Sequence, residues 1–241
     1  MLENALDGKI VLVTGASRGI GAAIAVACAR AGADVAVGYV QNREGAERTV
    51  ASILGLGRQA AAFEADVSDP DQVARMVRAV VEHFGRIDAL VNNAGIMPES
   101  PLLEMSVEEW KRVIDVDLTG AFLCTREVVP AMVERGEGAI INIASRLGQI
   151  GFPGVAHYSA AKAGVIGLTK ALAKELGPKG VRVNAVAPGV TVTDMAAEVM
   201  QGEVGRRRLA ELPAGRFAVP EDVAASVVFL LPATAFAALF G

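Results

Sequence analysis

Hydrophobic and polar positions form two patterns that alternate along the whole chain. Short, nearly continuous apolar runs bounded by Gly, Asp or Asn are typical of strands that are buried on both faces of a sheet. Longer segments with apolar residues three and four positions apart are typical of helices with one buried face. The runs that predict strands are Lys9–Val13, Asp34–Val37, Ile87–Val91, Ala139–Ile143 and Val181–Val186. The segments that predict helices include Ile20–Ala31, Gln72–Phe84, Ser106–Val133 and Ala160–Leu176.

This alternation predicts an α/β fold, a Rossmann-like doubly wound parallel sheet between two layers of helices. No linker and no internal repeat interrupts the pattern, so we expect residues 1–241 to form a single domain. The apolar stretch Ala224–Gly241 is 18 residues long and contains Pro232. A membrane span needs about 20 apolar residues. We therefore expect a buried helix from near Pro220 to Leu231 instead.

Composition and charge narrow the class of protein further. The chain is 52% hydrophobic and 21% charged, which excludes a disordered protein. Its net charge of −4 argues against nucleic acid as a partner, because phosphate binding needs a basic face. The cysteines Cys28 and Cys124 and the histidines His83 and His157 provide neither a disulfide framework nor a metal-ligand set. No apolar leader is visible, and we expect a cytoplasmic protein with no metal and no membrane partner.

A glycine-rich segment, Thr14–Gly21, follows the first predicted strand and opens the first predicted helix. Gly15, Gly19 and Gly21 permit a tight turn and let a pyrophosphate approach backbone N–H groups at the helix N-terminus. The spacing G-x-x-x-G-x-G differs from the usual G-x-G-x-x-G, and an ordinary strand-to-helix turn is the alternative interpretation. The position at the first strand and first helix favours a dinucleotide site.

The charges around the second predicted strand indicate which dinucleotide is bound. An acid at the end of that strand would bind a ribose 2′-hydroxyl and repel a 2′-phosphate, but Val37–Val40 contains none. Arg18 in the glycine segment and Arg43 beyond the strand suit bidentate contact with a 2′-phosphate. Arg43 is equally compatible with a solvated position at a helix start. The sequence favours NADPH over NADH.

Tyr158 and Lys162 are one helical turn apart and therefore share one face of a predicted helix. A phenol ordinarily has a pKa of about 10, and a nearby ammonium stabilises the phenolate, which suits a general acid for carbonyl reduction. Ser145 follows a predicted strand, where its hydroxyl can bind a substrate oxygen as negative charge develops. The spacing Y-x-x-x-K alone is a weak signal, and its coincidence with Ser145 and a dinucleotide segment strengthens it.

With these residues the chain resembles the short-chain dehydrogenase/reductase family from Gly8 to about Leu231. Within that family it resembles the 3-oxoacyl-[acyl-carrier-protein] reductases. This implies NADPH-dependent reduction of a ketone to a secondary alcohol, with a 3-oxoacyl thioester on an acyl carrier protein as the expected substrate. The matching segments are Thr14–Gly21, Asp66–Val67, Asn92–Gly95, Ser145, Tyr158, Lys162, Asn184, Pro188–Gly189 and Thr193–Met195.

The resemblance implies a role for each matching position. Ser145 and Tyr158 would bind the substrate oxygen, and Lys162 would also bind the nicotinamide ribose together with Tyr158. The nicotinamide carboxamide would contact Thr193 and the backbone of Val190. The remaining residues that would contact the cofactor are Gly15, Ser17, Arg18, Gly19, Ile20, Gly21, Asp66, Val67, Asn93, Ala94 and Gly95.

Two positions depart from the family pattern. The family's fourth catalytic residue is an Asn in N-x-x-G, whereas this chain has Asp117 in D-L-T-G. An ionised Asp accepts hydrogen bonds but donates none, and pairs with Lys162 if it points inward. After Phe229–Leu230 the family continues into a last strand, whereas this chain continues PATAFAALFG, so the last strand is expected to be missing or altered.

The resemblance also places the substrate and its partners. Substrate loops are expected at 97–105, 146–156 and 195–213, and the apolar middle loop suggests an acyl group. Lys179 and Arg135 are the basic residues proposed to contact a carrier protein. The long helices resemble those with which the family forms homo-oligomers, and both a dimer and a tetramer remain open.

Two alternatives also remain open on the sequence alone. One is a dehydrogenase of a sugar or another secondary alcohol that works in the oxidative direction. The other is an NADP-binding homologue in which Asp117 and the altered tail impair catalysis.

Overall fold

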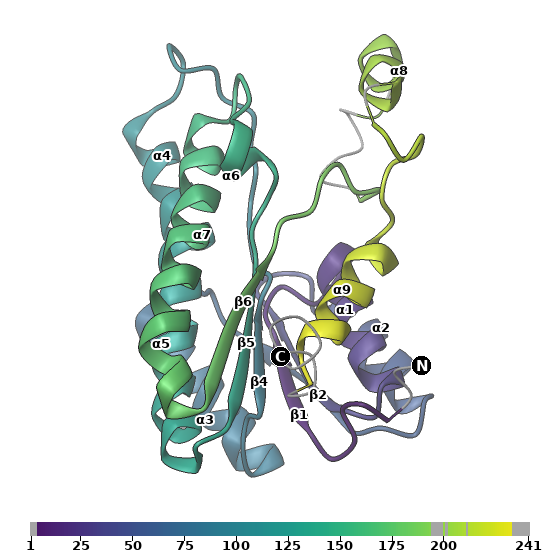
Figure 1. The fold of residues 1–241 in the computed structure, drawn as a ribbon, viewed down its shortest axis with the longest axis vertical. Helices are drawn as coiled ribbons and strands as arrows, with labels where there is room; N and C mark the ends of the chain where they lie inside the picture. The colour runs from purple at the N-terminus through teal and green to yellow at the C-terminus, as the bar shows by residue number, and fades with distance from the viewer. Residues whose placement is uncertain (1–3, 194–199, 201, 211, 233–241) are drawn as a thin grey trace.

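A parallel sheet of six strands, in the order β3-β2-β1-β4-β5-β6, forms the middle layer of the protein (Figure 1). This computed structural model describes residues 4–193, 200, 202–210 and 212–232, except for the side chains of 204 and 208. The chain crosses over between the third and fourth strands, because β1 lies between β2 and β4. The strands are β1 Ile10–Val13, β2 Asp34–Tyr39, β3 Ala60–Glu64, β4 Ala89–Asn92, β5 Gly138–Ile143 and β6 Val181–Val186.

Helices cover both faces of the sheet (Figure 1). One face packs against α1 Gly19–Arg30, α2 Arg43–Leu54 and α9 Pro220–Leu230. The other packs against α3 Pro70–Phe84, α5 Gly120–Arg135 and α7 Ala156–Leu176. The shorter helical elements are α4 Val107–Ile114, the π-helical segment η1 Asp115–Thr119, α6 Leu147–Ile150, η2 Gly177–Lys179 and α8 Gly202–Ala210.

The continuous apolar runs form strands because alternate side chains enter two different cores. In β1, Val11 and Val13 belong to the core beneath α1 and α9, whereas Leu12 belongs to the core beneath α3 and α5. Successive side chains of a strand point to opposite faces, so a sheet covered on both sides requires apolar residues at every position. The predicted α/β fold with a doubly wound parallel sheet is confirmed.

The structure differs from the sequence pattern in three elements. The pattern missed strand β3, because its sequence AAAFE lacks the β-branched residues typical of strands. The single helix expected at Ser106–Val133 is interrupted by η1. Helix α7 begins at Ala156 rather than Ala160, so that Tyr158 lies in its first turn.

The expected helix near the end of the chain is α9, with Pro220 in its first turn. The carboxylate of Asp222 accepts a hydrogen bond from the backbone of Val219 at 2.9 Å, which supports the start of this helix. Strand β6 lies at the edge of the sheet in the described part of the chain. Residues 233–241, with most of the tail PATAFAALFG, lie outside the described residues, as do Asp194 and Met195. Among the described residues no helix is long and apolar enough to cross a membrane.

Candidate active site

The loops after β1 and β4 are joined at the carboxyl end of the sheet by side-chain hydrogen bonds. Thr14 Oγ1 accepts hydrogen bonds from the backbone N–H groups of Asn93 and Ala94, at 3.0 and 3.1 Å. In return, Asn93 Nδ2 donates to the backbone carbonyls of Thr14 and Gly15, at 3.0 and 3.1 Å. The two predicted cofactor segments therefore form one rigid unit.

Two glycines of the first loop are required by its geometry. Gly15 has a φ of 64°, and a Cβ on it would lie 2.8 Å from Ala94 Cα. A Cβ on Gly21 would lie 2.3 Å from the carbonyl oxygen of Gly15. No other residue allows this close packing of loop on loop and helix on loop.

The start of helix α1, beside this loop, is suited to an anionic group such as the pyrophosphate of a dinucleotide. Helix α1 begins after Arg18, which makes no side-chain capping bond there, and has no acid in its first turn. Its first N–H groups are thus suited to bind a phosphate. A Cβ on Gly19 would lie 3.4 Å from Thr193 Cγ2, so Thr193 lies beside the glycine loop. The carbonyl of Val190 accepts a hydrogen bond from Ala218 N at 3.1 Å, which fixes the backbone before Thr193.

The residues predicted to contact the adenosine half of the cofactor lie on two separate elements, α2 and the loop after β3. Arg43 is exposed and forms an ion pair with Glu47 at 2.8 Å, on its own helix. Beside it, Tyr39 donates a hydrogen bond to Glu64 at 3.2 Å, and burial, together with this bond, raises the pKa of Tyr39. Glu64 is an acid next to the end of β2 that the sequence pattern missed, because it comes from the unpredicted strand β3. Asp66 lies in the loop after β3, where its side chain accepts two hydrogen bonds from Ser68.

Ser145 follows β5, and its Oγ accepts a hydrogen bond from the backbone of Leu147 at 3.1 Å. This contact orients Oγ and leaves its proton to donate elsewhere. The next backbone groups are held by the loop after β6, because Arg146 N donates to the carbonyl of Pro188 at 3.0 Å. The serine therefore stands on a fixed segment.

Lys162 is buried and lies between β5 and the tyrosine. Its Nζ donates a hydrogen bond to the carbonyl of Ile143 at 3.0 Å and lies 5.5 Å from the ring centroid of Tyr158. Tyr158 and Lys162 share the face of α7 that meets the end of β5. The structure thus brings the predicted tyrosine and lysine together at the strand that Ser145 follows.

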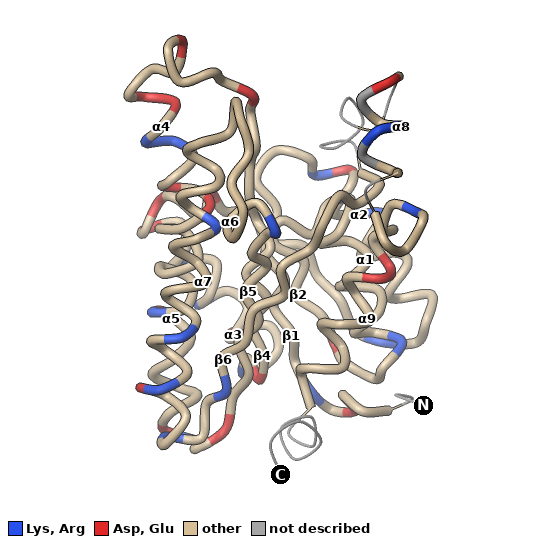
Figure 2. Tube along the Cα trace, turned by 45° about the horizontal axis from the view of Figure 1, so that its top comes forward, with Lys and Arg blue, Asp and Glu red and all other residues tan. Residues whose placement is uncertain are grey.

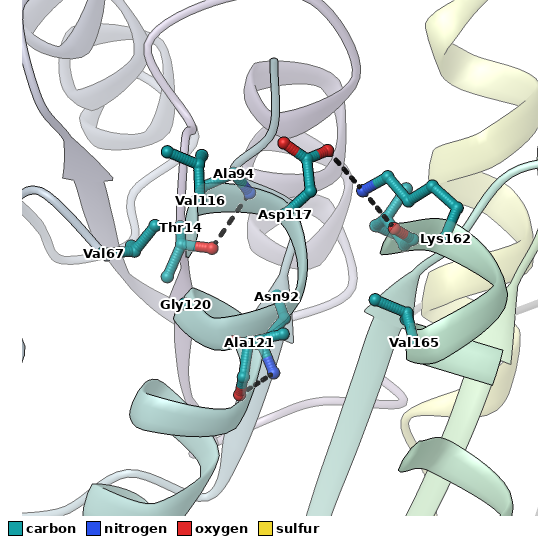
Figure 3. A pocket seen from close by; sticks show the side chains of 11 residues that line it. Thr14, Val67, Asn92, Ala94, Val116, Asp117, Gly120, Ala121, Lys162 and Val165 are labelled. Carbon is teal, nitrogen blue, oxygen red and sulfur yellow. Dashed lines mark hydrogen bonds and ion pairs between the residues drawn. The ribbon is translucent and has the colours of Figure 1, made fainter. Parts of the chain in front are cut away.

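Asp117 points inward, as Figure 3 shows, and forms an ion pair with Lys162. Its Oδ2 lies 3.2 Å from Lys162 Nζ, and its Oδ1 accepts a hydrogen bond from Ile96 N at 2.8 Å. Burial raises the pKa of the Asp117 carboxyl, and the ammonium of Lys162 opposes that shift. A Cβ on Gly95 would lie 2.6 Å from Asp117 Oδ2, so Gly95 leaves the space that the pair occupies.

A small enclosed cavity of about 10 Å³, measured as space open to the centre of a water molecule, lies beside this pair (Figure 3). Asp117, Lys162, Asn92 and Val67 are among the residues that line it. Asn92 Oδ1 is buried without a hydrogen-bond partner in the described part of the chain, and Asp117 Oδ2 has there only its ion pair with Lys162. The cavity wall therefore combines polar atoms with apolar side chains, and its size is close to that of one water molecule.

Two of the expected substrate loops meet above the site. Ser100 N, in the loop at 97–105, donates a hydrogen bond to the carbonyl of Gly154, in the loop at 146–156, at 2.8 Å. Leu102, Leu103 and Ile150 are exposed apolar side chains of these loops. The third loop, 195–213, falls largely on α8 and on residues outside the described ranges.

The placement of Lys179 and Arg135 near the mouth of the site was wrong. Arg135 is the last residue of α5 and donates to the carbonyl of Ile87, just before β4 begins. Lys179 lies just before β6 begins. Both are at the amino ends of strands, whereas Ser145 follows the carboxyl end of β5. Figure 2 shows basic and acidic residues interspersed along the helices of the described chain.

Sequence reasoning named Thr14, Gly95 and His157 but did not predict how each of them supports the site. Thr14 joins the two cofactor loops through its hydroxyl, and Gly95 gives space to the ion pair. His157, directly before Tyr158, is completely buried. A signal for Thr14 was available, because it is a polar residue that directly follows the apolar run of the first predicted strand. In the described residues no group of three or more His, Cys, Asp or Glu side chains is placed to hold a metal.

A doubly wound sheet with a glycine loop at its crossover, and a Ser-Tyr-Lys set beyond β5, defines a dinucleotide-dependent oxidoreductase. A family model described as "short chain dehydrogenase" matches residues 9–204. The chain belongs to this family.

Individual relatives cover nearly the whole chain. A 3-oxoacyl-[acyl-carrier-protein] reductase from Synechocystis is 47% identical over 234 residues, which are 96% of this chain and 93% of that protein. A solved structure from Brucella melitensis with the same description has a TM-score of 0.90 and 39% identity, over 98% of this chain and 89% of that one. A structure from Beutenbergia cavernae, described as an NAD(P)-dependent gluconate 5-dehydrogenase with bound NADP, has a TM-score of 0.91 and 40% identity. That match covers 98% of this chain and 94% of the other.

Proposed function

We propose that this protein reduces a 3-oxoacyl thioester to the corresponding secondary alcohol with NADPH, and that the thioester is carried by an acyl carrier protein. The observation that carries the proposal is the arrangement of Tyr158, Lys162 and Ser145 around the end of β5, beside a dinucleotide loop. The likeness to 3-oxoacyl-[acyl-carrier-protein] reductases supports this choice of substrate.

The chemistry follows from these three side chains. A bound nicotinamide supplies the hydride to the carbonyl carbon. Ser145, whose Oγ is oriented by Leu147 N, donates its proton in a hydrogen bond to the substrate oxygen. Tyr158 gives its phenolic proton to the same oxygen, and the ammonium of Lys162 stabilises the phenolate that remains. Acid catalysis of this kind contributes roughly a hundred- to ten-thousand-fold to the rate.

The residues of the glycine loop fit NADPH. Gly21 lets α1 pack against the glycine loop, and Gly15 lets the loop after β4 pack against it. The backbone N–H groups at the start of α1, from Gly19 onward, would bind the pyrophosphate. Arg18 is exposed at the N-terminus of α1. We assign its guanidinium to the 2′-phosphate of NADPH. Arg43 joins it only by releasing Glu47, and therefore contributes less. Asp66, Val67 and Ala94 are assigned to the adenosine, and Ile20 and Ser17 to the loop contacts.

The loops above the site are proposed to bind the acyl chain. The loops at 97–105 and 146–156 are joined by the Ser100–Gly154 hydrogen bond and present exposed apolar side chains, including Leu103 and Ile150. Such a surface suits an alkyl chain better than a polyol. We also propose that residues 1–241 act as one domain, in a cytoplasmic homo-oligomer.

A second candidate is a sugar-acid or secondary-alcohol dehydrogenase that works in the oxidative direction. The likeness to the structure described as a gluconate 5-dehydrogenase favours it, because the identity is as high as to the Brucella structure. The same Ser145, Tyr158 and Lys162 serve oxidation with each proton transfer reversed. The substrate, and not the catalytic set, separates the two candidates.

The test is the initial rate of cofactor oxidation with an acetoacetyl thioester, with NADPH and NADH compared side by side. We expect turnover with NADPH, a rate at least tenfold lower with NADH, and a rate near background for Tyr158→Phe. Gluconate with NADP⁺ is the parallel assay. Turnover of gluconate but not of the thioester would replace the proposed substrate, whereas binding of NADPH without turnover of either would favour an impaired homologue.

A further inference from the structure

His157 is a completely buried imidazole that stands directly before Tyr158 in the first turn of α7. Its Nδ1 accepts a hydrogen bond from the backbone N–H of Tyr158 at 2.8 Å. Its Nε2 is also buried and has no hydrogen-bond partner in the described part of the protein. The proposed function assigns no role to this side chain.

The hydrogen bond fixes the proton on the ring. A nitrogen that accepts from an N–H group carries a lone pair, so the proton of the neutral ring is on Nε2. An imidazolium has no free lone pair on either nitrogen and loses this bond. The charged groups that interact electrostatically with the ring from neighbouring elements are Glu109 of α4 and Asp117 of η1.

Nδ1 of His157 accepts a hydrogen bond from the backbone N–H of Tyr158, which has no partner within helix α7. The first N–H groups of any helix have no carbonyl one turn earlier. Val155, the residue before α7, provides no side-chain acceptor, whereas Ser159 N already bonds to the carbonyl of Val155 at 2.9 Å. The N–H of Tyr158 is therefore satisfied by His157.

A leucine of similar size would fill the same buried space. It would avoid a buried Nε2–H without an acceptor, a group whose desolvation costs about 1–3 kcal/mol. Unlike leucine, the imidazole accepts a hydrogen bond at Nδ1 from the backbone N–H of Tyr158. That contact acts on the main chain of the residue that carries the catalytic phenol.

We propose that neutral His157 is a positioning residue that fixes the first turn of α7 and thereby holds the Tyr158 phenol in register with Lys162 and Ser145. The inference rests on the proposed function for its kinetic consequence, but the hydrogen bond itself is independent of the substrate. It predicts that the contact matters far more for turnover than for cofactor binding, because most of the predicted cofactor contacts lie on the glycine loop and on other elements.

The kinetic experiment compares three variants in the full-length protein. His157→Leu keeps the volume and removes the acceptor, His157→Asn restores an acceptor favoured in the first turn of a helix, and exposed His83→Asn is the matched control. We expect kcat of His157→Leu to fall roughly ten- to a hundredfold with little change in KM for NADPH, since small misplacements of a catalytic group have effects of this order. His157→Asn should recover most of that loss, and the control should match the wild type.

A spectroscopic readout keeps the inference testable even if His157→Leu does not fold. The chain has only two histidines, so a proton–nitrogen correlation spectrum of the rings is assigned with the His83 variant. We expect an unprotonated Nδ1 and a protonated Nε2 at His157 in the wild type. A protonated Nδ1, or a folded His157→Leu with wild-type kcat, would overturn the inference. If the wild type does not reduce the thioester, the proposed function fails, and the ring spectrum alone still decides whether this bond exists.

Discussion

Replacement of Asp117 by asparagine changes one charge at the site and little else. The amide keeps the size of the side chain, and its oxygen can still accept the hydrogen bond from Ile96 N. The variant removes the negative charge that lies 3.2 Å from Lys162 Nζ. Lys162 retains its bond to the carbonyl of Ile143, and it is no longer drawn away from the tyrosine. We therefore expect Asp117→Asn to keep or raise turnover.

The expected change in stability follows from two opposing energies. At 3.2 Å and an effective dielectric constant of about 20, the attraction between Asp117 and Lys162 is about 5 kcal/mol. Burial raises the pKa of the Asp117 carboxyl although Lys162 lowers it, so the cost of burying the charge exceeds the attraction. Removing the carboxylate removes both energies. We expect the free energy of unfolding at neutral pH to change by less than about 2 kcal/mol. This is below the roughly 3–5 kcal/mol lost when removal of one partner leaves a buried charge uncompensated, because Lys162 keeps its hydrogen bond to the carbonyl of Ile143.

The raised pKa of Asp117 also determines how the free energy of unfolding changes with pH. Because its pKa is raised in the folded protein, Asp117 holds its proton to a higher pH there than in the unfolded chain. Its contribution to stability is complete below about pH 4, the ordinary range for Asp, and is lost as the pH rises through the raised pKa. The stability of Asp117→Asn relative to the wild type should therefore increase with pH.

Urea unfolding and thioester turnover from about pH 5 to 9 test these expectations, with Asp115→Asn as the matched control. Asp115 is exposed in the same π-helical segment, so that substitution removes one negative charge without touching Lys162. A fall in turnover of about two orders of magnitude, 2.7 kcal/mol in activation free energy, would refute the reasoning for Asp117→Asn. A loss of more than about 3 kcal/mol in stability would refute the balance of energies.

Three further substitutions or treatments have defined outcomes. Gly95→Ala should lower stability by about 1–3 kcal/mol and should also lower turnover, because its Cβ would lie 2.6 Å from Asp117 Oδ2. Urea unfolding and steady-state kinetics would measure the two losses. In an Asp117→Ser background, which removes the clashing oxygen, both losses should be smaller. Thr14→Val leaves two backbone N–H groups of the loop after β4 without an acceptor and should cost about 2–4 kcal/mol in the same unfolding assay. Cys28 and Cys124 should resist a thiol reagent until the protein unfolds, because burial raises the pKa of each thiol to about 12; reaction of the native protein within minutes at neutral pH would contradict this.

The fold followed from the sequence wherever burial on two faces demanded apolar residues at every position. β1 and β5 are such strands, and their boundaries agree with the pattern to one residue. β3 did not follow, because its alanines are typical of a helix and uncommon in strands. Its pairing with β2, which places Glu64 beside Tyr39, is decided by the neighbouring strand and not by local preference.

The candidate site was predictable as a set of residue types and not as a set of contacts. Spacing alone places Tyr158 and Lys162 on one helix face, and both lie in α7. Spacing does not show that Lys162 bonds to the carbonyl of Ile143, because that contact joins a helix to a strand 19 positions away. The orientation of Ser145 depends likewise on the turn that follows it.

The direction of Asp117 was open for a deeper reason. In a regular helix from 106 to 133, the face on which residue 117 lies would follow from 3.6 residues per turn. The π-helical segment Asp115–Thr119 widens one turn and so changes the face of the helix on which residue 117 lies. No residue in DVDLT indicates this change. Beside the segment, Gly95 leaves space for a carboxylate against Lys162. Local irregularity and missing side-chain volume together create the buried ion pair, and this pair lies at the lysine that the proposed chemistry uses.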